Sequence, residues 1–212
     1  KMEDFKKLSI IIPAFNEAAT IHLILNRIKE VILINGIIKE LIIVNDCSTD
    51  DTEQAINDYT KKNPDLLIQY YKHEINKGKG AAIHTGIQKA TGQYLIIQDA
   101  DLEYDPRDYP ELLKPIQEGL ADVVYGSRFL GRAHRVTMFW HMLANKSLTL
   151  MTNILYDTIL TDMETGYKVF KREVIEGLTI RANSFNFEPE FTAKILKRKY
   201  RIFEVPITFN PR

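Results

Sequence analysis

Tyr94-Leu-Ile-Ile-Gln-Asp-Ala-Asp-Leu-Glu-Tyr-Asp-Pro106 joins a short apolar run directly to a cluster of acidic side chains. Its first four residues have the aliphatic, β-branched character of a buried strand. Asp99, Asp101 and Glu103 follow at intervals of two, which puts all three on one face of an extended backbone. No basic residue lies within the stretch, so a divalent cation with hard oxygen ligands is one candidate to neutralise them. The alternative is a solvated loop whose acids cap the helix that Pro106 introduces.

The chain before and after this stretch alternates between strand and helix patterns. In the first half we expect strands at 8–13, 41–45, 66–71 and 94–98, and helices at about 17–31, 52–62 and 78–90. The second half is expected to hold helices at 109–118, within 136–160, from 172 and at 188–199, with strands at 122–125, 167–170 and 201–205. Strands separated by helices predict an α/β fold with a mostly parallel sheet covered on both faces.

Composition limits the classes of protein that the chain can represent. Its 212 residues suit one α/β domain, and equal numbers of basic and acidic residues, 28 each, argue against nucleic acid as a partner. Cys47 is the one cysteine, which excludes an intramolecular disulfide and fits a reducing compartment. We expect no signal peptide, and the apolar region 136–159 is too interrupted, by His141, Lys146 and Asp157, for a transmembrane span.

The expected architecture locates a site at the carboxyl ends of the strands, where ligands of open α/β sheets bind. Segments 14–17, 46–50 and 99–103 should converge there. The glycine fingerprint of a dinucleotide site is missing after the first strand. A nucleotide held through its base and ribose by Phe15, Glu17 and Asp46, with its phosphates reached through a metal at 99–103, fits these segments better. Alternatively, Asp46 and Asp50 cap the helix at 52–62.

Six segments resemble, in the same order, the motifs of family 2 glycosyltransferases of the GT-A fold. These segments are Ile10-Ile-Ile-Pro-Ala-Phe-Asn-Glu17, Val44-Asn-Asp-Cys-Ser-Thr-Asp-Asp51, Asn76-Lys-Gly-Lys-Gly80, Asp99-Ala-Asp101, Gly126-Ser-Arg128 and Thr165-Gly-Tyr-Lys-Val-Phe170. Within that family the chain resembles the dolichyl- or polyprenyl-phosphate sugar synthases. The resemblance implies one catalytic domain over 1–212, with a Rossmann-like sheet, a flexible lead-in at 1–7, a nucleotide-binding half at 8–106 and an acceptor-side half at 107–212.

The resemblance also implies roles for individual residues. Asp99 and Asp101 match the family's DXD motif and would hold Mg²⁺ or Mn²⁺, with Glu103 in the position of a third metal ligand. The residues implied in nucleotide-sugar binding are Pro13, Phe15, Glu17, Val44, Asp46, Asp99, Ala100, Asp101, Arg128 and Arg212. Those implied in catalysis are Asp101, Arg128 and Asp162. Relatives continue past the position of Arg212 with a Gly-Ser-Lys or Gly-Lys-Lys segment.

The implied reaction is metal-dependent, inverting transfer of a hexose from a GDP- or UDP-sugar to polyprenyl phosphate. A phosphate acceptor is largely ionised at neutral pH and needs cations more than a base. Arg128, with Arg132, Arg135 or Lys146, would supply them. If the acceptor were a saccharide hydroxyl, Asp162 or Glu188 would be the candidate base, although Glu188 is alternatively a helix-start acid. A third possibility, from another class, is a non-catalytic module that binds nucleotide sugars.

The apolar region 136–160 bears on where the protein works. Phe139 and Trp140, close to Arg135 and Lys146, suit a helix that lies in a lipid interface. The alternative is that this region belongs to the ordinary hydrophobic core. With a lipid acceptor, the first reading predicts a peripheral protein at the cytoplasmic face of the membrane.

Overall fold

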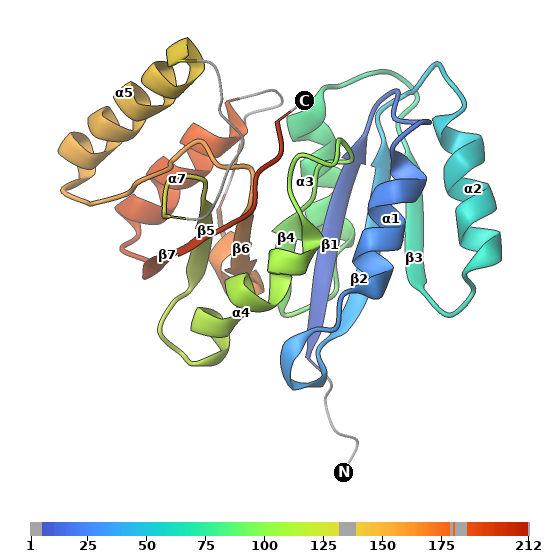
Figure 1. Cartoon of the computed structure of the whole chain (residues 1–212), viewed down its shortest axis with the longest axis horizontal. Coiled ribbons are helices and arrows are strands. Elements are labelled where there is room, and N and C mark those ends of the chain that lie inside the picture. The colour runs from blue at the N-terminus through green and yellow to red at the C-terminus, as the bar shows by residue number, and fades with distance from the viewer. Residues whose placement is uncertain (1–5, 132–138, 179, 181–185, 212) are drawn as a thin grey trace.

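The computed structural model describes residues 6–131, 139–178, 180 and 186–211 of the chain. Within them, seven strands form one sheet between two layers of helices (Figure 1). The strands are β1 (Lys7–Ala14), β2 (Ile38–Asn45), β3 (Leu67–Lys72), β4 (Tyr94–Ile97), β5 (Val123–Ser127), β6 (Lys168–Lys171) and β7 (Ile202–Pro206). The α-helices are α1 (Ile21–Glu30), α2 (Thr52–Lys62), α3 (Lys79–Lys89), α4 (Tyr109–Gln117), α5 (Phe139–Tyr156), α6 (Arg172–Ile175) and α7 (Phe187–Lys197), and two 3₁₀ turns are η1 (Ile34–Gly36) and η2 (Pro106–Asp108).

The sheet is mostly parallel, as predicted, with the strand order β3-β2-β1-β4-β6-β5-β7. β1 pairs in parallel with β2 and β4, and β5 with β7, whereas β6 runs antiparallel to both of its neighbours. In register, Ile11 of β1 pairs with Ile42 of β2 on one side and Ile97 of β4 on the other. The carboxyl ends of β1, β2 and β4 therefore lie side by side at one edge.

Alternation along each strand divides the core between the two faces of the sheet. Ile10 and Ile12 pack on the face that α1, α2 and α4 cover, and Ile11 packs on the face covered by α3 and α7. All three side chains are completely buried. Complete burial of an aliphatic side chain contributes roughly 1.5–3 kcal/mol, so β1 stabilises the packing of both layers.

Several element boundaries differ from the prediction by a few residues. The largest shift is at α1, which begins at Ile21 because the carbonyl of Glu17 accepts hydrogen bonds from the amides of Thr20 and Ile21 in a preceding turn. The expected extended backbone over 99–103 is wrong. Residues 100–103 form turns and bends, and Leu102 has a left-handed φ of 66°.

Helix α5 contradicts the alternative that the apolar residues of this region are ordinary core. Its one buried residue is Thr149, whereas Trp140 is 74% exposed and Ile154 and Leu155 are each 72% exposed. The helix lies at the outer edge of the molecule, beyond α7 (Figure 1). No helix in the described part of the chain is long and apolar enough to cross a membrane.

Gly86 marks the close approach of α3 to β1. A Cβ atom at this position would lie 2.3 Å from Cγ2 of the buried Ile11. We predict that Gly86→Ala lowers the free energy of unfolding by about 1–2 kcal/mol, because overpacking outweighs the gain in helix propensity. Urea denaturation measures the change. Gln88→Ala, at an exposed position on the same helix, is the control, and equal stability of the two variants would contradict the close packing.

Candidate active site

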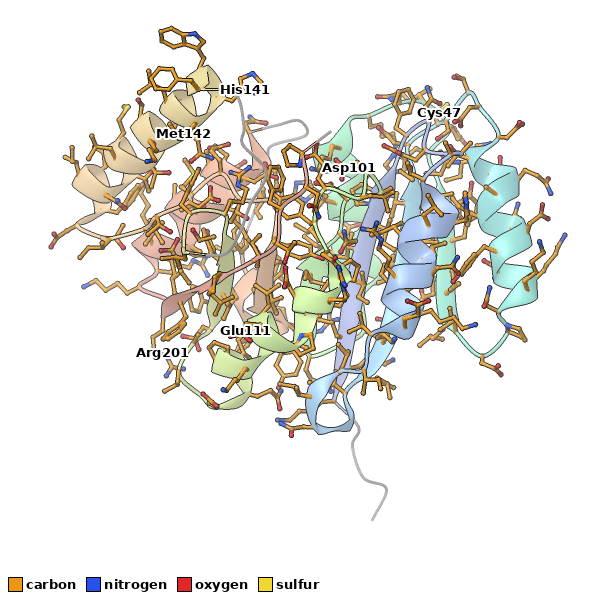
Figure 2. The ribbon with its side chains drawn as sticks, in the orientation of Figure 1. Cys47, Asp101, Glu111, His141, Met142 and Arg201 are labelled. Carbon is orange, nitrogen blue, oxygen red and sulfur yellow. The ribbon has the colours of Figure 1, made fainter. Side chains whose placement is uncertain are left out.

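The three loops predicted to converge line one pocket of about 500 Å³ at the carboxyl edge of the sheet. Asp101 and Cys47 lie at this end of the molecule, opposite Glu111 and Arg201 (Figure 2). The residues that line the pocket are Pro13, Ala14, Phe15, Glu17, Asp46, Asn76, Gly78, Lys79, Ala82, Asp99, Ala100 and Asp101. The predicted convergence of segments 14–17, 46–50 and 99–103 is thus present in the structure, and a fourth segment, 76–82, joins them.

Side-chain hydrogen bonds join the loops after β1 and β2. The backbone amide of Asn16 donates to Oγ of Ser48 at 3.0 Å. The backbone amide of Thr49 donates to the side-chain oxygen Oδ1 of Asn16 at 2.8 Å. The Asp50 carboxylate accepts from the Ala18 amide at 3.2 Å. These bonds fix the wall from which Phe15, which is 46% exposed, presents its ring.

Asp46 anchors the loop that forms the opposite wall. Its carboxylate is almost completely buried and accepts from the amides of Lys77 and Gly78 at 2.9 and 2.7 Å. His73 also bonds to it through Nδ1 at 2.7 Å, and Nε2 of that ring lies 2.8 Å from the hydroxyl of Thr85. The alternative that Asp46 caps α2 is therefore wrong, because its oxygens hold the loop before α3 instead.

Asp99 is neutralised by a lysine that lies twenty positions earlier in the chain. Nζ of Lys79 lies 2.7 Å from Oδ1 and 2.9 Å from Oδ2 of Asp99. Burial lowers the pKa of Lys79, but the carboxylates of Asp99 and Glu188 outweigh this effect, and the net pKa lies above the ordinary value. The ammonium group is therefore charged, and it faces the pocket together with Asp99 and Asp101.

The three acids of the opening stretch do not form a three-carboxylate cluster. Because the chain turns at Leu102, the Glu103 amide donates back to Oδ1 of Asp101 at 3.1 Å. Among the residues that the structure describes, no three His, Cys, Asp or Glu side chains are grouped closely enough to hold a metal. Two carboxylates in one pocket nevertheless fit a hard cation that takes its remaining ligands from water and substrate phosphates. Glu103 as a third ligand stays a prediction.

A buried group of tyrosines supports the Asp99 loop from below. Oε1 of Gln98 accepts from the hydroxyls of Tyr109 and Tyr167 at 2.6 and 2.5 Å, and Nε2 donates to the Asp99 carbonyl at 3.0 Å. Tyr104 stacks on Tyr167 with 4.8 Å between ring centroids. Burial raises the pKa of Tyr104 to about 12, so the hydroxyl stays neutral and accepts from the Gly166 amide at 2.9 Å.

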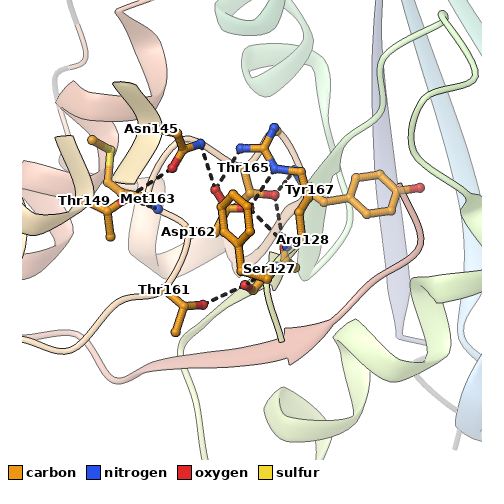
Figure 3. Close-up of polar contacts among 12 residues, drawn as sticks. Ser127, Arg128, Asn145, Thr149, Thr161, Asp162, Met163, Thr165 and Tyr167 are labelled. Atoms are coloured by element: carbon orange, nitrogen blue, oxygen red, sulfur yellow. Dashed lines mark hydrogen bonds and ion pairs between the residues drawn. The ribbon is translucent and has the colours of Figure 1, made fainter. Parts of the chain in front are cut away.

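Arg128 and Asp162 form an ion pair near this group, in which Asp162 is completely buried and Arg128 is partly exposed (Figure 3). Nε and Nη2 of Arg128 donate to the two carboxylate oxygens at 2.7 and 2.8 Å, and its backbone amide donates at 3.0 Å. Asn145 of α5 adds a fourth bond at 3.2 Å. Burial lowers the pKa of Arg128, but Asp162 outweighs this effect and raises it overall.

The role predicted for Asp162 as a base is not supported by this geometry. A carboxylate has about four lone-pair sites, and those of Asp162, which is completely buried, are taken by four donors. It orients Arg128, whose Nη1 makes no hydrogen bond to any residue that the structure describes. Arg128 is therefore a candidate phosphate-binding residue, and Asp162 its positioning residue.

Two further charged groups lie beneath the ion pair. Lys168 is completely buried, its Nζ donates to the Thr165 carbonyl, and it lies 4.7 Å from the centroid of the Tyr125 ring. Burial lowers the pKa of Lys168 to about 8, although the negative charges of Glu188, Asp162 and Glu164 act to raise it. Burial also raises the pKa of Glu164, whose Oε1 has no hydrogen-bond partner among the described residues.

Not every predicted residue lies where it was expected. Val44 is completely buried in the core beneath the pocket and is absent from its lining, so it supports the site without facing the ligand. Arg132, Arg135 and Arg212 lie outside the described residues. The sequence reasoning missed Lys79, although the segment 76–80 was recognised as a motif and its place before a helix at the strand ends was a usable signal.

The family model described as Glycosyl transferase family 2 matches residues 9–179. The chain belongs to glycosyltransferase family 2, and the resemblance drawn from its six motifs is confirmed. The structure adds the contacts that hold these motifs together at one edge of the sheet.

Curated relatives cover nearly all of the chain. The dolichol-phosphate mannosyltransferase of Pyrococcus furiosus is 30% identical over 210 residues, which are 97% of this chain and 57% of that protein. The low-salt glycan biosynthesis hexosyltransferase Agl6 of Haloferax volcanii is 29% identical over 97% of this chain and 48% of its own length. The polyprenol monophosphomannose synthase of Mycolicibacterium smegmatis is 27% identical over 96% of this chain and 77% of its own length. The chain thus spans about half the length of the first two.

Solved structures share the fold at low sequence identity. The glucosyl-3-phosphoglycerate synthase of Mycobacterium tuberculosis, in complex with Mn²⁺, UDP and phosphoglyceric acid, superposes with a TM-score of 0.76 at 20% identity, over 96% of this chain and 69% of that one. The mannosyltransferase PcManGT of Pyrobaculum calidifontis, in complex with GDP-Man and Mn²⁺, gives a TM-score of 0.72 at 22% identity, over 98% and 57%. The predicted GT-A fold is therefore confirmed.

The lowered pKa of Lys168 predicts a pH dependence of stability. Between about pH 8 and the ordinary lysine pKa, the unfolded chain binds a proton that the folded chain does not, so stability rises with pH in this window. The wild type should gain on the order of 2 kcal/mol relative to Lys168→Met between about pH 7.5 and about pH 9.5. Urea unfolding of both proteins measures the difference. If the free energy of unfolding changed with pH in the same way in both proteins, burial of the Lys168 amine would not lower its pKa.

Proposed function

We propose that the protein transfers a hexose from a nucleotide-diphospho-sugar to polyprenyl phosphate, with inversion at the anomeric carbon and dependence on Mg²⁺ or Mn²⁺. The observation that carries this proposal is the pocket that Asp99, Asp101 and Lys79 line together, with Arg128 beyond Tyr104. A paired carboxylate and ammonium group suit a diphosphate and its cation, and the partly exposed guanidinium of Arg128 suits another phosphate. The names of the Pyrococcus and Mycolicibacterium relatives support a lipid phosphate as acceptor.

On the donor side, Phe15 would stack on the base, while Glu17 and Asp46 would stand nearest to the ribose and base. Asp99 and Asp101 would hold the cation, which when bound stabilises negative charge on the departing diphosphate. Lys79 would lie close to the oxygens of the diphosphate, because its ammonium group contacts Asp99. GDP and UDP both fit this arrangement, and titrations with each distinguish them.

On the acceptor side, Arg128 would hold the lipid phosphate in line with the anomeric carbon. This phosphate is ionised at neutral pH, so it attacks without a general base. The complete set of hydrogen bonds on Asp162 agrees with this requirement, because a protein that activated a sugar hydroxyl would need a carboxylate with an unused lone pair. The observation therefore removes Asp162 as the base for a saccharide hydroxyl, and leaves that role to Glu188, an acid in the first turn of α7 whose charge acts on Lys79 and Lys168.

The exposed face of α5 supports attachment to the cytoplasmic surface of a membrane. An ordinary surface helix buries its apolar side, whereas α5 exposes Phe139, Trp140, Ile154 and Leu155. The helix contains Lys146 and no acidic residue, which suits a surface with anionic lipids. A bilayer would cover this face and deliver the polyprenyl chain to the acceptor side.

Transfer itself is tested with labelled GDP- and UDP-hexoses, Mn²⁺ or Mg²⁺, and polyprenyl phosphate in detergent or vesicles. We expect the label in the lipid fraction, and Asp101→Ala should lower the rate at least about 100-fold without changing the circular dichroism spectrum. Asp65→Ala, an exposed acid away from the nucleotide pocket, is the control. Label on a saccharide, binding without turnover, or full activity of Asp101→Ala in the presence of a chelator would contradict the proposal.

Membrane attachment is tested by sedimentation with vesicles that contain anionic lipid. The double variant Ile154→Ser/Leu155→Ser should bind at least about tenfold more weakly than the wild type, because it removes apolar area that the bilayer would bury. Ile32→Ser, at a residue that is 88% exposed outside α5, should bind like the wild type. If both variants bind equally, the apolar face of α5 is not the lipid contact. A second copy of the chain on this face would instead appear as a dimer without lipid.

A further inference from the structure

Helix α5 is docked on the protein through polar side chains spaced four residues apart. Asn145, Thr149 and Asn153 therefore share one face of the helix, and each bonds to the turn at 160–163. The bonds run from Asn145 Nδ2 to Asp162 Oδ1 at 3.2 Å, from the Met163 amide to Thr149 Oγ1 at 3.2 Å, from Asn153 Nδ2 to the Leu160 carbonyl at 2.9 Å, and from the Leu160 amide to Asn153 Oδ1 at 2.8 Å. Directed bonds of this kind fix the rotation of a helix about its axis more tightly than apolar contacts do.

Asn145 differs from the other two residues because its partner is itself the partner of Arg128. Thr149 donates to Oδ1 of Asn145 at 3.3 Å, which turns the Nδ2 group of the amide toward Asp162. Asp162 then holds the backbone amide, Nε and Nη2 of Arg128 (Figure 3). A continuous path of hydrogen bonds thus runs from α5 through one carboxylate to the guanidinium.

The backbone of the turn at 160–163 is also bonded to the sheet. The Glu204 carboxylate of β7 accepts from the amides of Thr161 and Asp162, so the turn at 160–163 is clamped between the sheet and α5. A shift of α5 therefore acts on Asp162 through the side chain of Asn145, since the backbone of that residue is tied to the sheet.

We infer that Asn145 is a positioning residue that couples the seating of α5 on a lipid surface to the orientation of Arg128. The inference rests on the proposed function, in which Arg128 binds the acceptor phosphate and a bilayer covers the apolar face of α5. In this arrangement the membrane fixes one side of α5, and Asn145 fixes the other side to Asp162. The guanidinium of Arg128 is then held at one depth relative to the lipid phosphates. The enzyme would then favour acceptors embedded in a bilayer over acceptors in solution.

Amide hydrogen exchange tests the coupling without relying on catalysis. In the wild type, anionic vesicles should slow exchange in α5 and also in the segment 127–129, whose Arg128 amide bonds to Asp162. In Asn145→Ala, vesicles should still slow exchange in α5, while the segment 127–129 loses at least about half of the added protection. Equal protection of 127–129 in both proteins, or none in the wild type, would overturn the inference.

Kinetics supply a second test with a matched control. Asn145→Ala should raise KM for polyprenyl phosphate in vesicles about tenfold, and should leave KM for the nucleotide sugar and the rate with a short, water-soluble isoprenyl phosphate within about twofold. Asn145→Gln keeps an amide donor and should restore part of the loss. Ser147→Ala is the control, because Ser147 donates only to Leu143 of its own helix among the contacts described.

The outcomes separate the inference from the proposed function. If the wild type transfers no sugar to either lipid phosphate, the proposed function fails, while the exchange experiment still decides whether α5 and Arg128 are coupled. If transfer occurs and Asn145→Ala slows both acceptors equally, or behaves like Ser147→Ala, the positioning role is overturned. Thermal melts of all variants show whether any loss comes from unfolding.

Discussion

The site depends on one constraint, which is that Asp46, Asp99 and Asp162 at this end of the sheet need partners that compensate their charge. The chain meets it differently at each position. Asp46 is held by backbone amides and His73, Asp99 by Lys79, and Asp162 by Arg128. An isolated buried carboxylate would cost several kcal/mol, so these partners are as necessary to the fold as they are to the site.

This compensation keeps two cations in place, Lys79 in the lining of the nucleotide pocket and Arg128 outside that lining. Lys79 faces the nucleotide pocket, and Arg128 lies beyond the tyrosine group that supports Asp99. Gly166 lies between the two sides, since a Cβ atom there would lie 3.1 Å from the Tyr104 ring and 3.4 Å from Asp99. The contiguity of these groups suits a reaction in which one phosphate leaves and another attacks.

Much of the fold could be predicted from the sequence because its strands and helices follow strong hydrophobic periodicity. The helix at 52–62 was predicted to the residue, and the first four strands to within three residues at their ends. The geometry of the turns was harder to predict from the sequence. The left-handed Leu102 broke the expected alignment of Asp99 with Glu103, since spacing alone does not reveal a backbone that leaves the extended region.

The candidate site was predictable where motifs sit at strand ends, and less so where partners come from distant segments. The pairing of Asp99 with Lys79 joins two segments that only the folded sheet brings together. The orientation of α5 was equally hidden. Its apolar residues fit a core helix as well as a lipid-facing one, and the polar contacts of Asn145, Thr149 and Asn153 with the turn at 160–163 decide which side faces inward.

In the proposed function, Asp99 and Asp101 bind a nucleoside diphosphate through a divalent cation. Calorimetric titration of GDP and UDP, each with Mn²⁺ and with a chelator, measures this binding. One nucleotide should bind at least about tenfold more tightly with the cation, and Asp101→Ala should abolish this difference. Equal affinity with and without the cation, in both the wild type and the variant, would contradict it.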